Sequence, residues 1–298
     1  MSAKILVTGA SGAIGRIIIH DMVNRGKEVR VGVHSEEQFN LVKMTGVELA
    51  RLEYGDFSTI DHALQEIESL FLITPYAREQ VEYAKRMIDR ALLFGVSHIV
   101  YVSIMGAEQE PGTQFGRWHR RVEKYLQSQS IASTILRPNV YMQNFLRFIQ
   151  PSGGFIYVPL NGAGVSYIDV RDVAAVASEV LIAGKEHFGN TYELTGPFPL
   201  TMDDVADILS EAVGSHVGYI NISEETAKHI MESLGTPGWM AEGILELYAM
   251  QRNGINSNLS GSVEEITGRK PVPFDQFAHD YANVFKAIVQ HEHHTYLS

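Results

Sequence analysis

The amino-terminal stretch Lys4-Ile-Leu-Val-Thr-Gly9-Ala-Ser-Gly12-Ala-Ile-Gly15 constrains the fold more than any other part of the sequence. Its apolar run from Ile5 to Val7 predicts a buried parallel strand. After three evenly spaced glycines, apolar residues recur at helical spacing from Ile14 to Met22. A strand, a tight turn and a helix place backbone N–H groups and a positive helix end beside an anion. The stretch therefore predicts a dinucleotide-binding loop, and the alternative is a glycine-rich turn without a ligand.

Each of the three glycines has its own role in such a loop. Gly9 allows the tight turn, Gly12 lets the backbone approach a diphosphate, and Gly15 lets the helix pack closely on the strand. The spacing is G-x-x-G-x-x-G rather than G-x-G-x-x-G. Because a glycine triplet alone is weak evidence, the assignment depends on the strand before it and the helix after it.

Strand and helix patterns alternate through the first half of the chain. Further strands are expected over residues 28–33, 47–52, 69–73, 98–103 and 132–136. Helices are expected over 36–44, from Ser58, and over 78–94 and 115–129. Strict alternation predicts an α/β fold of the Rossmann type, a doubly wound parallel sheet with helices on both faces. Ligands of such sheets bind at the carboxyl ends of the strands.

The pattern changes after residue 150. Glycines and prolines over 153–164 predict irregular loops and a small hairpin, and a helix is expected over 169–182. Strands are expected at 190–194 and near 217–222, and four or five helices follow Thr201. We therefore expect an NAD(P)-binding domain over 1–150, with 165–184 packing back onto it. Residues 151–298 are expected to form a smaller, mostly helical, substrate-binding lobe.

Composition excludes several classes of function. The net charge of −11 argues against nucleic-acid or anionic membrane surfaces. The chain has no cysteine, which excludes disulfides, thiolate catalysis and cysteine-based metal sites. No signal peptide or long apolar span is recognised, so a cytoplasmic monomer or homodimer is expected. The segment His291 to His294 is read as a terminal tail rather than a metal site.

Six segments together resemble one protein family. They are T-G-A-S-G-A-I-G (Thr8 to Gly15), Y-G-D-F (Tyr54 to Phe57), V-S-H-I-V-Y-V-S (Val96 to Ser103), W-H-R-R-V-E (Trp118 to Glu123), T-I-L-R-P-N (Thr134 to Asn139) and E-I-T-G-R-K-P (Glu265 to Pro271). Their order and spacing resemble the NmrA-like branch of the atypical short-chain dehydrogenases/reductases, of the triphenylmethane reductase and NAD(P)H:quinone oxidoreductase type. The resemblance covers nearly the whole chain but does not specify a substrate.

The resemblance implies a set of cofactor-binding residues. They are Gly9, Ser11, Gly12, Ala13 and Ile14 for the diphosphate, Asp56 and Phe57 beside the adenine, Thr74 and Pro75 along the nicotinamide ribose, and Ser103, Pro138 and Asn139 in the nicotinamide pocket. Each of these positions lies at an expected strand end, which agrees with the rule for ligands of parallel sheets.

The end of the second strand decides between the two nicotinamide cofactors. An acidic residue there would bind the ribose 2′-hydroxyl of NAD, but this position carries His34, followed by Ser35. These two side chains are suited to a 2′-phosphate, although an imidazole, with an ordinary pKa of about 6.5, is only partly protonated at neutral pH. Glu36 and Glu37 weaken the signal. We expect NADP(H), with NAD(H) as the alternative.

The catalytic Tyr and Lys of short-chain dehydrogenases, four residues apart on one helix, are missing. Their approximate places carry His119 and Glu123. His119 is one candidate proton donor, with a surface or structural histidine next to Trp118 as the alternative, and Glu123 is expected to raise the pKa of His119. Tyr141 and Tyr167 are alternative donors near the same sheet edge, and each is also suited to be a wall of the cleft or a packing residue.

Three functions remain open at this point. The first is a reductase that transfers hydride from NAD(P)H to a planar apolar acceptor such as a quinone or dye, without the Tyr–Lys pair. The second is a regulator that binds NADP(H) without catalysis, and the third is a biosynthetic enone or imine reductase. An apolar substrate wall of Met105, Met142, Phe145, Trp239 and Met240 favours a reductase, and core packing is the alternative role of each of these residues.

Overall fold

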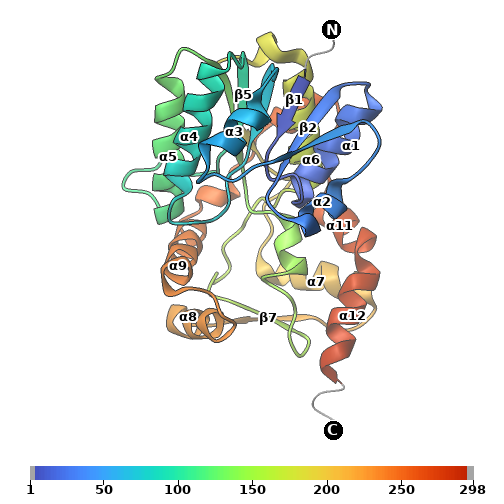
Figure 1. Ribbon diagram of the computed structural model, residues 1–298. Coiled ribbons are helices and arrows are strands. Elements are labelled where there is room, and N and C mark those ends of the chain that lie inside the picture. Colours follow the sequence, from blue (N-terminus) through green and yellow to red (C-terminus); the bar gives the residue numbers. More distant parts are fainter. Residues whose placement is uncertain (1–3, 294–298) are drawn as a thin grey trace.

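A seven-stranded parallel sheet forms the centre of the molecule in the computed structural model, which describes residues 4–293 (Figure 1). Its strands are β1 (Lys4–Val7), β2 (Glu28–Val33), β3 (Val47–Arg51), β4 (Ser69–Leu72), β5 (His98–Val102), β6 (Ala132–Pro138) and β8 (Thr191–Leu194). The spatial order is β3-β2-β1-β4-β5-β6-β8, and every neighbouring pair is parallel. The predicted doubly wound fold is thereby confirmed, and the order reverses between β1 and β4.

Helices cover both faces of this sheet. The helices on one face are α1 (Ala13–Asn24), α2 (Glu36–Val42) and α6 (Val170–Ala183), and those on the other are α3 (Phe57–Leu64), α4 (Gln80–Leu93) and α5 (Gln114–Gln127). Alternation along β1 explains the two cores. Ile5 and Val7 pack against α1 and α6, whereas Leu6 packs with α3, α4 and α5.

A buried arginine lies inside the sheet. Arg30 on β2 is 4% exposed, and its guanidinium donates to the backbone oxygens of Ala63 and Gln65 at the end of α3. It also pairs with Glu48 on β3 at 2.6 Å. The charge satisfies the carbonyls that a helix leaves without partners at its carboxyl end. Arg30 is therefore committed to the fold.

The second half of the chain forms most of a lobe at the carboxyl edge of the sheet (lower part of Figure 1). Its elements are β7 (Phe155–Val158), α7 (Met202–Val213), β9 (Gly218–Asn221), α8 (Glu224–Ser233), α9 (Gly238–Arg252), α11 (Phe274–Asp280) and α12 (Ala282–His293). Three short 3-10 helices, η1 (Met142–Leu146), η2 (Gly184–His187) and η3 (Ile255–Ser257), and the helix α10 (Ser262–Thr267) complete the chain. β8 and α6 belong to the sheet layer, so both layers use residues beyond 150.

One expectation for this half was incomplete and one was wrong. An antiparallel bridge joins Ser152 and Phe155 across the two expected glycines, but β7 itself pairs in parallel with β9, more than sixty positions later in the chain. Six α-helices, rather than four or five, follow Thr201 within residues 4–293. Glycines and prolines in the loops indicate turns but do not identify the strand that will pair with β7.

The lobe has its own hydrophobic core, against which α9 packs through Tyr248. Phe145, Phe274, Phe277 and Phe285 are fully buried or nearly so in this core. The α8–α9 pair packs on itself and reaches the sheet layer through α5 and η3 (lower left of Figure 1). This arm is therefore the part of the lobe that faces the carboxyl ends of the central strands.

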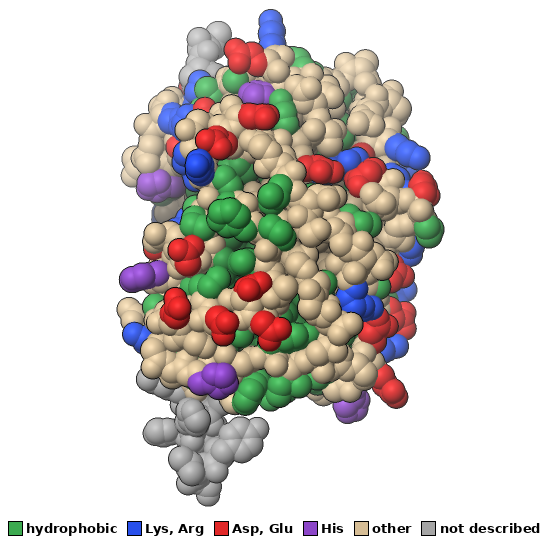
Figure 2. Space-filling view, turned by 180° about the vertical axis from the view of Figure 1, so that it is seen from behind, with side chains coloured by type: hydrophobic (Ala, Val, Ile, Leu, Met, Phe, Trp, Pro, Cys, Tyr) green, Lys and Arg blue, Asp and Glu red, His purple; other side chains and the backbone are tan. Residues whose placement is uncertain are grey.

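The surface agrees with the acidic composition. On the face shown in Figure 2, hydrophobic side chains gather near the middle and acidic side chains lie around and below them. Within residues 4–293, no helix is long and apolar enough to cross a membrane. The segment His291 to His294, read above as a tail, lies outside the side chains that the structure describes.

Candidate functional site

The loop between β1 and α1 can form only with glycine at two positions. Gly9 has a φ of +61°, and a Cβ there would lie 2.2 Å from Cγ2 of Ile73. A Cβ on Gly15 would lie 2.5 Å from the carbonyl oxygen of Gly9. The turn and the close approach of α1 to β1 therefore both depend on these glycines.

The outer side of this loop is open and offers backbone donors. Gly12 is the N-cap of α1 and provides no side chain to bond the first turn. Gly12 and Ala13 are exposed, and Ser11 is half-buried. Because the first N–H groups of a helix lack partners within it, those of Ala13 and Ile14 are available to an anion. The geometry fits a diphosphate, which Ser11, Gly12, Ala13 and Ile14 would hold.

Thr74, directly after β4, supports the same fit. Its hydroxyl oxygen is buried and has no hydrogen-bond partner in the part of the chain that the structure describes. Buried polar atoms of native proteins are nearly always paired, so a polar ligand group beside Thr74 would complete it. Pro75, which follows, is exposed. These two residues lie at the end of the strand next to β1, where the sheet order reverses.

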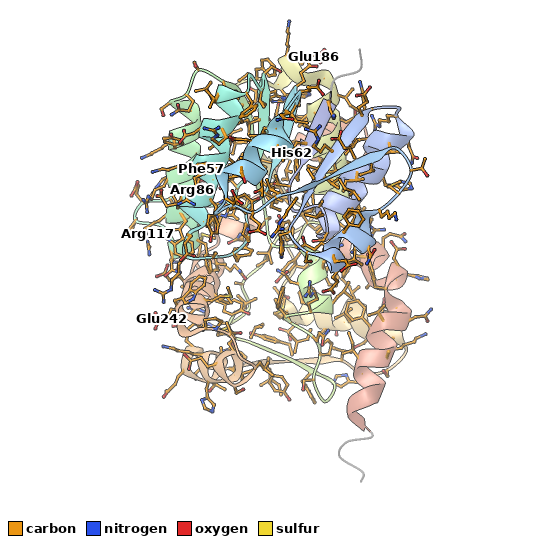
Figure 3. The ribbon with its side chains drawn as sticks, in the orientation of Figure 1. Phe57, His62, Arg86, Arg117, Glu186 and Glu242 are labelled. Atoms are coloured by element: carbon orange, nitrogen blue, oxygen red, sulfur yellow. The ribbon has the colours of Figure 1, made fainter. Side chains whose placement is uncertain are left out.

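Asp56 and Phe57 lie at the start of α3. The carboxylate of Asp56 accepts from the backbone N–H of Ser58 at 2.8 Å, and hydrogen bonds from Ser58 lower the pKa of Asp56. The ring of Phe57 is 51% exposed, and the guanidinium of Arg86 lies 5.6 Å from its centroid (Figure 3). An exposed aromatic ring at this edge is suited to pack on an adenine.

His34 and Ser35 lie at the end of β2, as expected, and both are exposed. Ser35 is the N-cap of α2 and accepts from the backbone N–H of Gln38 at 3.2 Å. Arg30, four positions before His34, is bonded to Ala63 and Glu48 and is therefore not available to a cofactor. The exposed imidazole of His34 is therefore a side chain that this strand end offers to a ribose phosphate.

An apolar cavity of about 250 Å³ lies beyond the ends of β5 and β6, under α9. It is lined by Tyr76, Ile104, Met105, Phe115, Pro138, Asn139, Val140, Tyr141, Asn144, Phe148, Ile149, Met240, Ile244, Leu247, Tyr248, Met250, Gln251 and Asn256. No lining residue carries a charge. Tyr76 follows the Thr74–Pro75 pair, so the cavity adjoins the expected nicotinamide side of the sheet edge.

The expected apolar wall is only partly correct. Met105 and Met240 line the cavity. Met142 and Phe145 instead belong to the core of the lobe. Trp239 packs on Trp118 of α5, with ring centroids 5.6 Å apart. Helical periodicity predicted these side chains to be buried but not which of two neighbouring spaces each one faces.

His119 on α5 is buried in a polar network with residues of β5 and α4. Its ring nitrogens lie 2.8 Å from the hydroxyl of Tyr101 and 3.0 Å from the amide of Gln80. Burial lowers the pKa of His119 to about 3, so the imidazole is neutral. The expectation that Glu123 raises this pKa was wrong. His119 does not line the cavity, and its role as a donor stays a prediction.

Glu123 is committed to two other residues. Its carboxylate accepts from the hydroxyl of Ser103 at 2.5 Å and from the guanidinium of Arg137 at 2.6 Å. The pKa of Arg137 is raised chiefly by this hydrogen bond. Ser103 is therefore buried against Glu123 rather than lining the cavity, whereas Pro138 and Asn139 do line it.

The two candidate tyrosines lie in different surroundings. Tyr141 lines the cavity, and burial raises its pKa, so its hydroxyl remains protonated. Tyr167 is 2% exposed and packs in the core of the lobe, with its ring centroid 5.2 Å from that of Phe145. Tyr141 alone of the three proposed donors lines the cavity.

A larger and more open groove of about 790 Å³ runs along α1 and α6. Arginines line it, but carboxylates neutralise most of them. Arg171 pairs with Asp169 and Asp280, and Arg269 pairs with Asp172. The groove lies on the helix-covered face and not at the strand ends, so we place the substrate site in the cavity.

Sequence reasoning missed the polar side chains that α9 and η3 bring to the cavity. These are Tyr248, Gln251 and Asn256. No motif surrounds them, and they lie more than a hundred positions beyond β6 in the chain. The only signal was the helical pattern of this region, which indicates a helix but not its position over the sheet edge.

The chain is similar in sequence to proteins of known function. It is 32% identical over 285 residues to an NAD(P)H azoreductase from Xenophilus azovorans, covering 95% of this chain and 99% of that protein. Two solved structures share its fold. An NADPH-dependent quinone oxidoreductase from Escherichia coli, complexed with NADPH, has a TM-score of 0.84 at 24% identity, covering 93% of this chain and 99% of that one.

The second structure is triphenylmethane reductase from Citrobacter complexed with NADP(H), with a TM-score of 0.81 at 23% identity, covering 93% of this chain and 99% of that one. The sheet order, the glycine-rich loop and the cavity at the strand ends define a Rossmann-type protein. The model of the NmrA-like family matches residues 1–277, and the chain belongs to this family. The resemblance predicted from the six sequence segments is thereby confirmed.

Proposed function

We propose that the chain is an NAD(P)H-dependent reductase of a planar, neutral, apolar acceptor, with NADP(H) as the preferred cofactor. Membership of the NmrA-like family and the similarity to an NAD(P)H azoreductase support the general activity. A second relative, quinone oxidoreductase 2 from Escherichia coli, is 28% identical over 244 residues. A small-molecule acceptor is therefore the expected partner.

The uncharged cavity carries the proposal for the acceptor class. Its wall is apolar apart from amides and phenols, and its volume of about 250 Å³ lies just below the usual range for ligand pockets, about 300–1,000 Å³. Burial of an unpaired charge is strongly unfavourable, because nothing in the wall replaces the lost hydration. The acceptor is accordingly neutral and has about one or two fused rings.

The chain's own residues position the two reactants and exclude water. When bound along the loop and Thr74, NAD(P)H supplies a hydride and is oxidised, and the acceptor gains the hydride and one proton. Pro138 and Asn139 form the floor of the cavity, and α9 covers it. Positioning of this kind lowers the barrier without a strong acid.

Tyr141 is the proton donor that we favour among the three candidates. It is the one that lines the cavity, and its raised pKa keeps the hydroxyl protonated at neutral pH. His119 is neutral and bonded to Gln80 and Tyr101, and Tyr167 is packed in the lobe. Tyr141→Phe is expected to lower kcat by about tenfold to hundredfold, within the range for general acids.

A regulator that binds NADP(H) without catalysis is the second candidate. The observation that favours it is the burial of His119 and Glu123, which occupy the approximate places of the catalytic Tyr and Lys. Both side chains bond other residues of the fold, and neither lines the cavity. The uncharged cavity itself favours the reductase.

The test is oxidation of NADPH and NADH with a matched panel of acceptors. The panel contains menadione, a sulfonated naphthoquinone, a neutral azo dye and an enone. We expect turnover with neutral acceptors and at least a hundredfold lower kcat/KM for the sulfonate than for menadione, about 2.7 kcal/mol. Tight NADPH binding without oxidation by any acceptor would establish the regulator instead, and failure to bind any nicotinamide nucleotide would remove both candidates.

A further inference from the structure

We propose that Gln251 binds the carbonyl oxygen of the acceptor, and that the chain therefore prefers ring carbonyl compounds, quinones and enones, to azo dyes. The inference rests on the proposed reductase function and narrows its substrate. It assigns a role to a residue of α9 that belongs to none of the family's sequence segments described above.

The side chain of Gln251 is buried but has nothing to bond. The residue is 5% exposed and lines the cavity. Among the described residues, its amide makes no hydrogen bond. Its nitrogen and oxygen nevertheless keep some accessible surface, unlike the unpartnered polar atoms that are fully buried. The amide therefore opens onto the cavity and is available to a ligand. Buried amides are normally paired, so this one is completed by what the cavity holds.

The amides of Asn139 and Asn256, which also line the cavity, are committed to each other. Asn139 donates to the backbone oxygen of Asn256 at 2.9 Å and accepts from the backbone N–H of Val140 at 2.8 Å. These two bonds fix its orientation. Its Oδ1 also accepts from the amide of Asn256 at 2.6 Å. This pair ties η3 to the end of β6 and uses one N–H donor of each of the two amides within the fold.

Asn144 offers a second amide from another wall. It lies on η1 and lines the cavity, and its side chain makes no hydrogen bond within residues 4–293. Among the described residues, Gln251 and Asn144 are thus the two lining carboxamides whose side chains make no hydrogen bond at all. The phenols of Tyr76, Tyr141 and Tyr248 also line the cavity, and the Oδ1 of Asn256 is buried without a partner.

An amide donor suits the electron flow of carbonyl reduction. In an enone, hydride adds to the β-carbon, the π electrons move to the carbonyl oxygen, and a proton then neutralises the enolate. In a quinone, the hydride brings two electrons and one proton, and one further proton, which Tyr141 would donate, completes the hydroquinone. In both cases negative charge develops on an oxygen at the edge of the ring, where an N–H donor stabilises it without titrating.

An azo dye presents its reducible nitrogens between two aryl groups. Its nitrogens lie in the middle of the molecule, away from a donor that serves a ring edge. The position of the Gln251 amide in the cavity wall therefore favours ring carbonyl acceptors.

The primary test is Gln251→Met, which keeps the length of the side chain and removes the donor. We expect kcat/KM for menadione to fall by about a hundredfold, the effect of losing one donor to a developing oxyanion. The affinity for NADPH is expected to stay within about twofold, since Gln251 is not one of the proposed cofactor residues. Gln127→Met, the same change at an exposed position at the end of α5, is the matched control and is expected to be silent.

Two further readouts separate substrate binding from a structural role. Menadione binding to protein saturated with NADP⁺, where no turnover occurs, is measured by calorimetry and is expected to weaken about tenfold in Gln251→Met. Gln251→Glu is expected to lose activity at pH 7.5, because a carboxylate repels the developing oxyanion. That variant is expected to regain activity as the pH falls, because a protonated carboxyl again donates.

The outcomes distinguish this inference from the function on which it rests. If the wild-type protein reduces menadione and Gln251→Met does so equally well, the role of Gln251 is overturned and the reductase stands. If the wild-type protein reduces the azo dye with a higher kcat/KM than menadione, the preference for carbonyl acceptors is overturned. If the wild-type protein oxidises NADPH with none of these acceptors, the proposed function itself fails.

Discussion

The glycine-rich loop and the cavity under α9 lie at the same edge of the sheet but are built in different ways. The loop is made by backbone from one continuous stretch, residues 8–15, and its shape depends on Gly9 and Gly15. The cavity is made by side chains from six separate segments, between Tyr76 and Asn256. A backbone site is specified by local sequence, whereas a side-chain site is specified only once the chain has folded.

This difference separates a shared site from a variable one. The loop requires only that certain positions have no side chain. Its backbone N–H groups can therefore bind an anion whatever acceptor the cavity holds. The cavity takes its character from amides and phenols such as Gln251 and Tyr141, each of which a single substitution changes. On the proposed function, we therefore expect substrate choice to depend on α9 and η1, and cofactor binding to depend on β1 and α1.

The largest expected effect is the loss of stability that follows removal of the Glu123 carboxylate. Glu123→Ala removes the carboxylate between Ser103 and Arg137 and leaves a largely buried guanidinium without its closest partner. We expect a loss of about 3–5 kcal/mol in the free energy of unfolding, measured by urea denaturation. Glu53→Ala, which breaks an exposed pair with Arg51, is the control and is expected to cost less than about 1 kcal/mol. Equal effects of the two variants would contradict a structural role for Glu123.

The next prediction acts on the loop alone. Gly12→Val places a branched side chain at the N-cap of α1, where the backbone is expected to meet the diphosphate. We expect NADPH affinity to fall by about a hundredfold, or ~2.7 kcal/mol, measured by fluorescence titration. Gly164→Ala, at a loop position where a Cβ meets only an ordinary contact, is the control. Unchanged NADPH binding by a folded Gly12→Val protein would break the assignment of the loop.

His119 provides a prediction with a defined pH window. Its pKa is about 3 in the folded protein because of burial, against an ordinary 6.5. As the pH falls, His119 binds a proton in the unfolded chain before it does so in the folded protein. The contribution of neutral His119 to the free energy of unfolding is therefore complete above pH 6.5 and is lost as the pH falls toward 3. At pH 5 the loss reaches about 2 kcal/mol, at 1.36 kcal/mol per unit.

The matched variant is His119→Gln, whose amide does not titrate. His98, whose pKa burial lowers to about 4, is present in both proteins, so the difference between them isolates His119. We expect the variant to lose less stability than wild type between pH 7 and pH 5. Parallel losses would show that His119 does not titrate in this way, and a large fall in kcat at neutral pH would restore it as the proton donor.

The smallest expected effect concerns the choice of cofactor. His34→Arg gives the end of β2 a permanent charge with donors suited to a phosphate. We expect the ratio of NADPH to NADH affinity to rise by about tenfold, or 1.4 kcal/mol, with little change for NADH. Titration of both nucleotides measures it. A rise in both affinities alike would place His34 away from the ribose 2′ position.

The sequence predicted the fold well because each element carries its own signal. β1 to β6 and α6 were expected within a few residues, since apolar runs and glycine-rich turns recur at regular spacing. The pairing of β7 with β9 was missed, because strand partners distant in the chain leave no local pattern.

The site was predictable only in part, for the same physical reason. Gly9 and Gly12 are identified by spacing, and Pro138 and Asn139 by their place at a strand end. The surroundings of His119 and Glu123 were misjudged, because periodicity places both on α5 but does not reveal that Gln80, Tyr101 and Arg137 bond them. Gln251 carried no signal at all.

The most direct test of the account is a single-turnover mixing of NADPH-bound protein with menadione, followed by the loss of reduced-nicotinamide absorbance. The account predicts stoichiometric oxidation of the bound nucleotide, slowed when the transferred hydrogen of NADPH is deuterium and slowed about a hundredfold in Gln251→Met. Bound NADPH that stays reduced in the presence of menadione would contradict it.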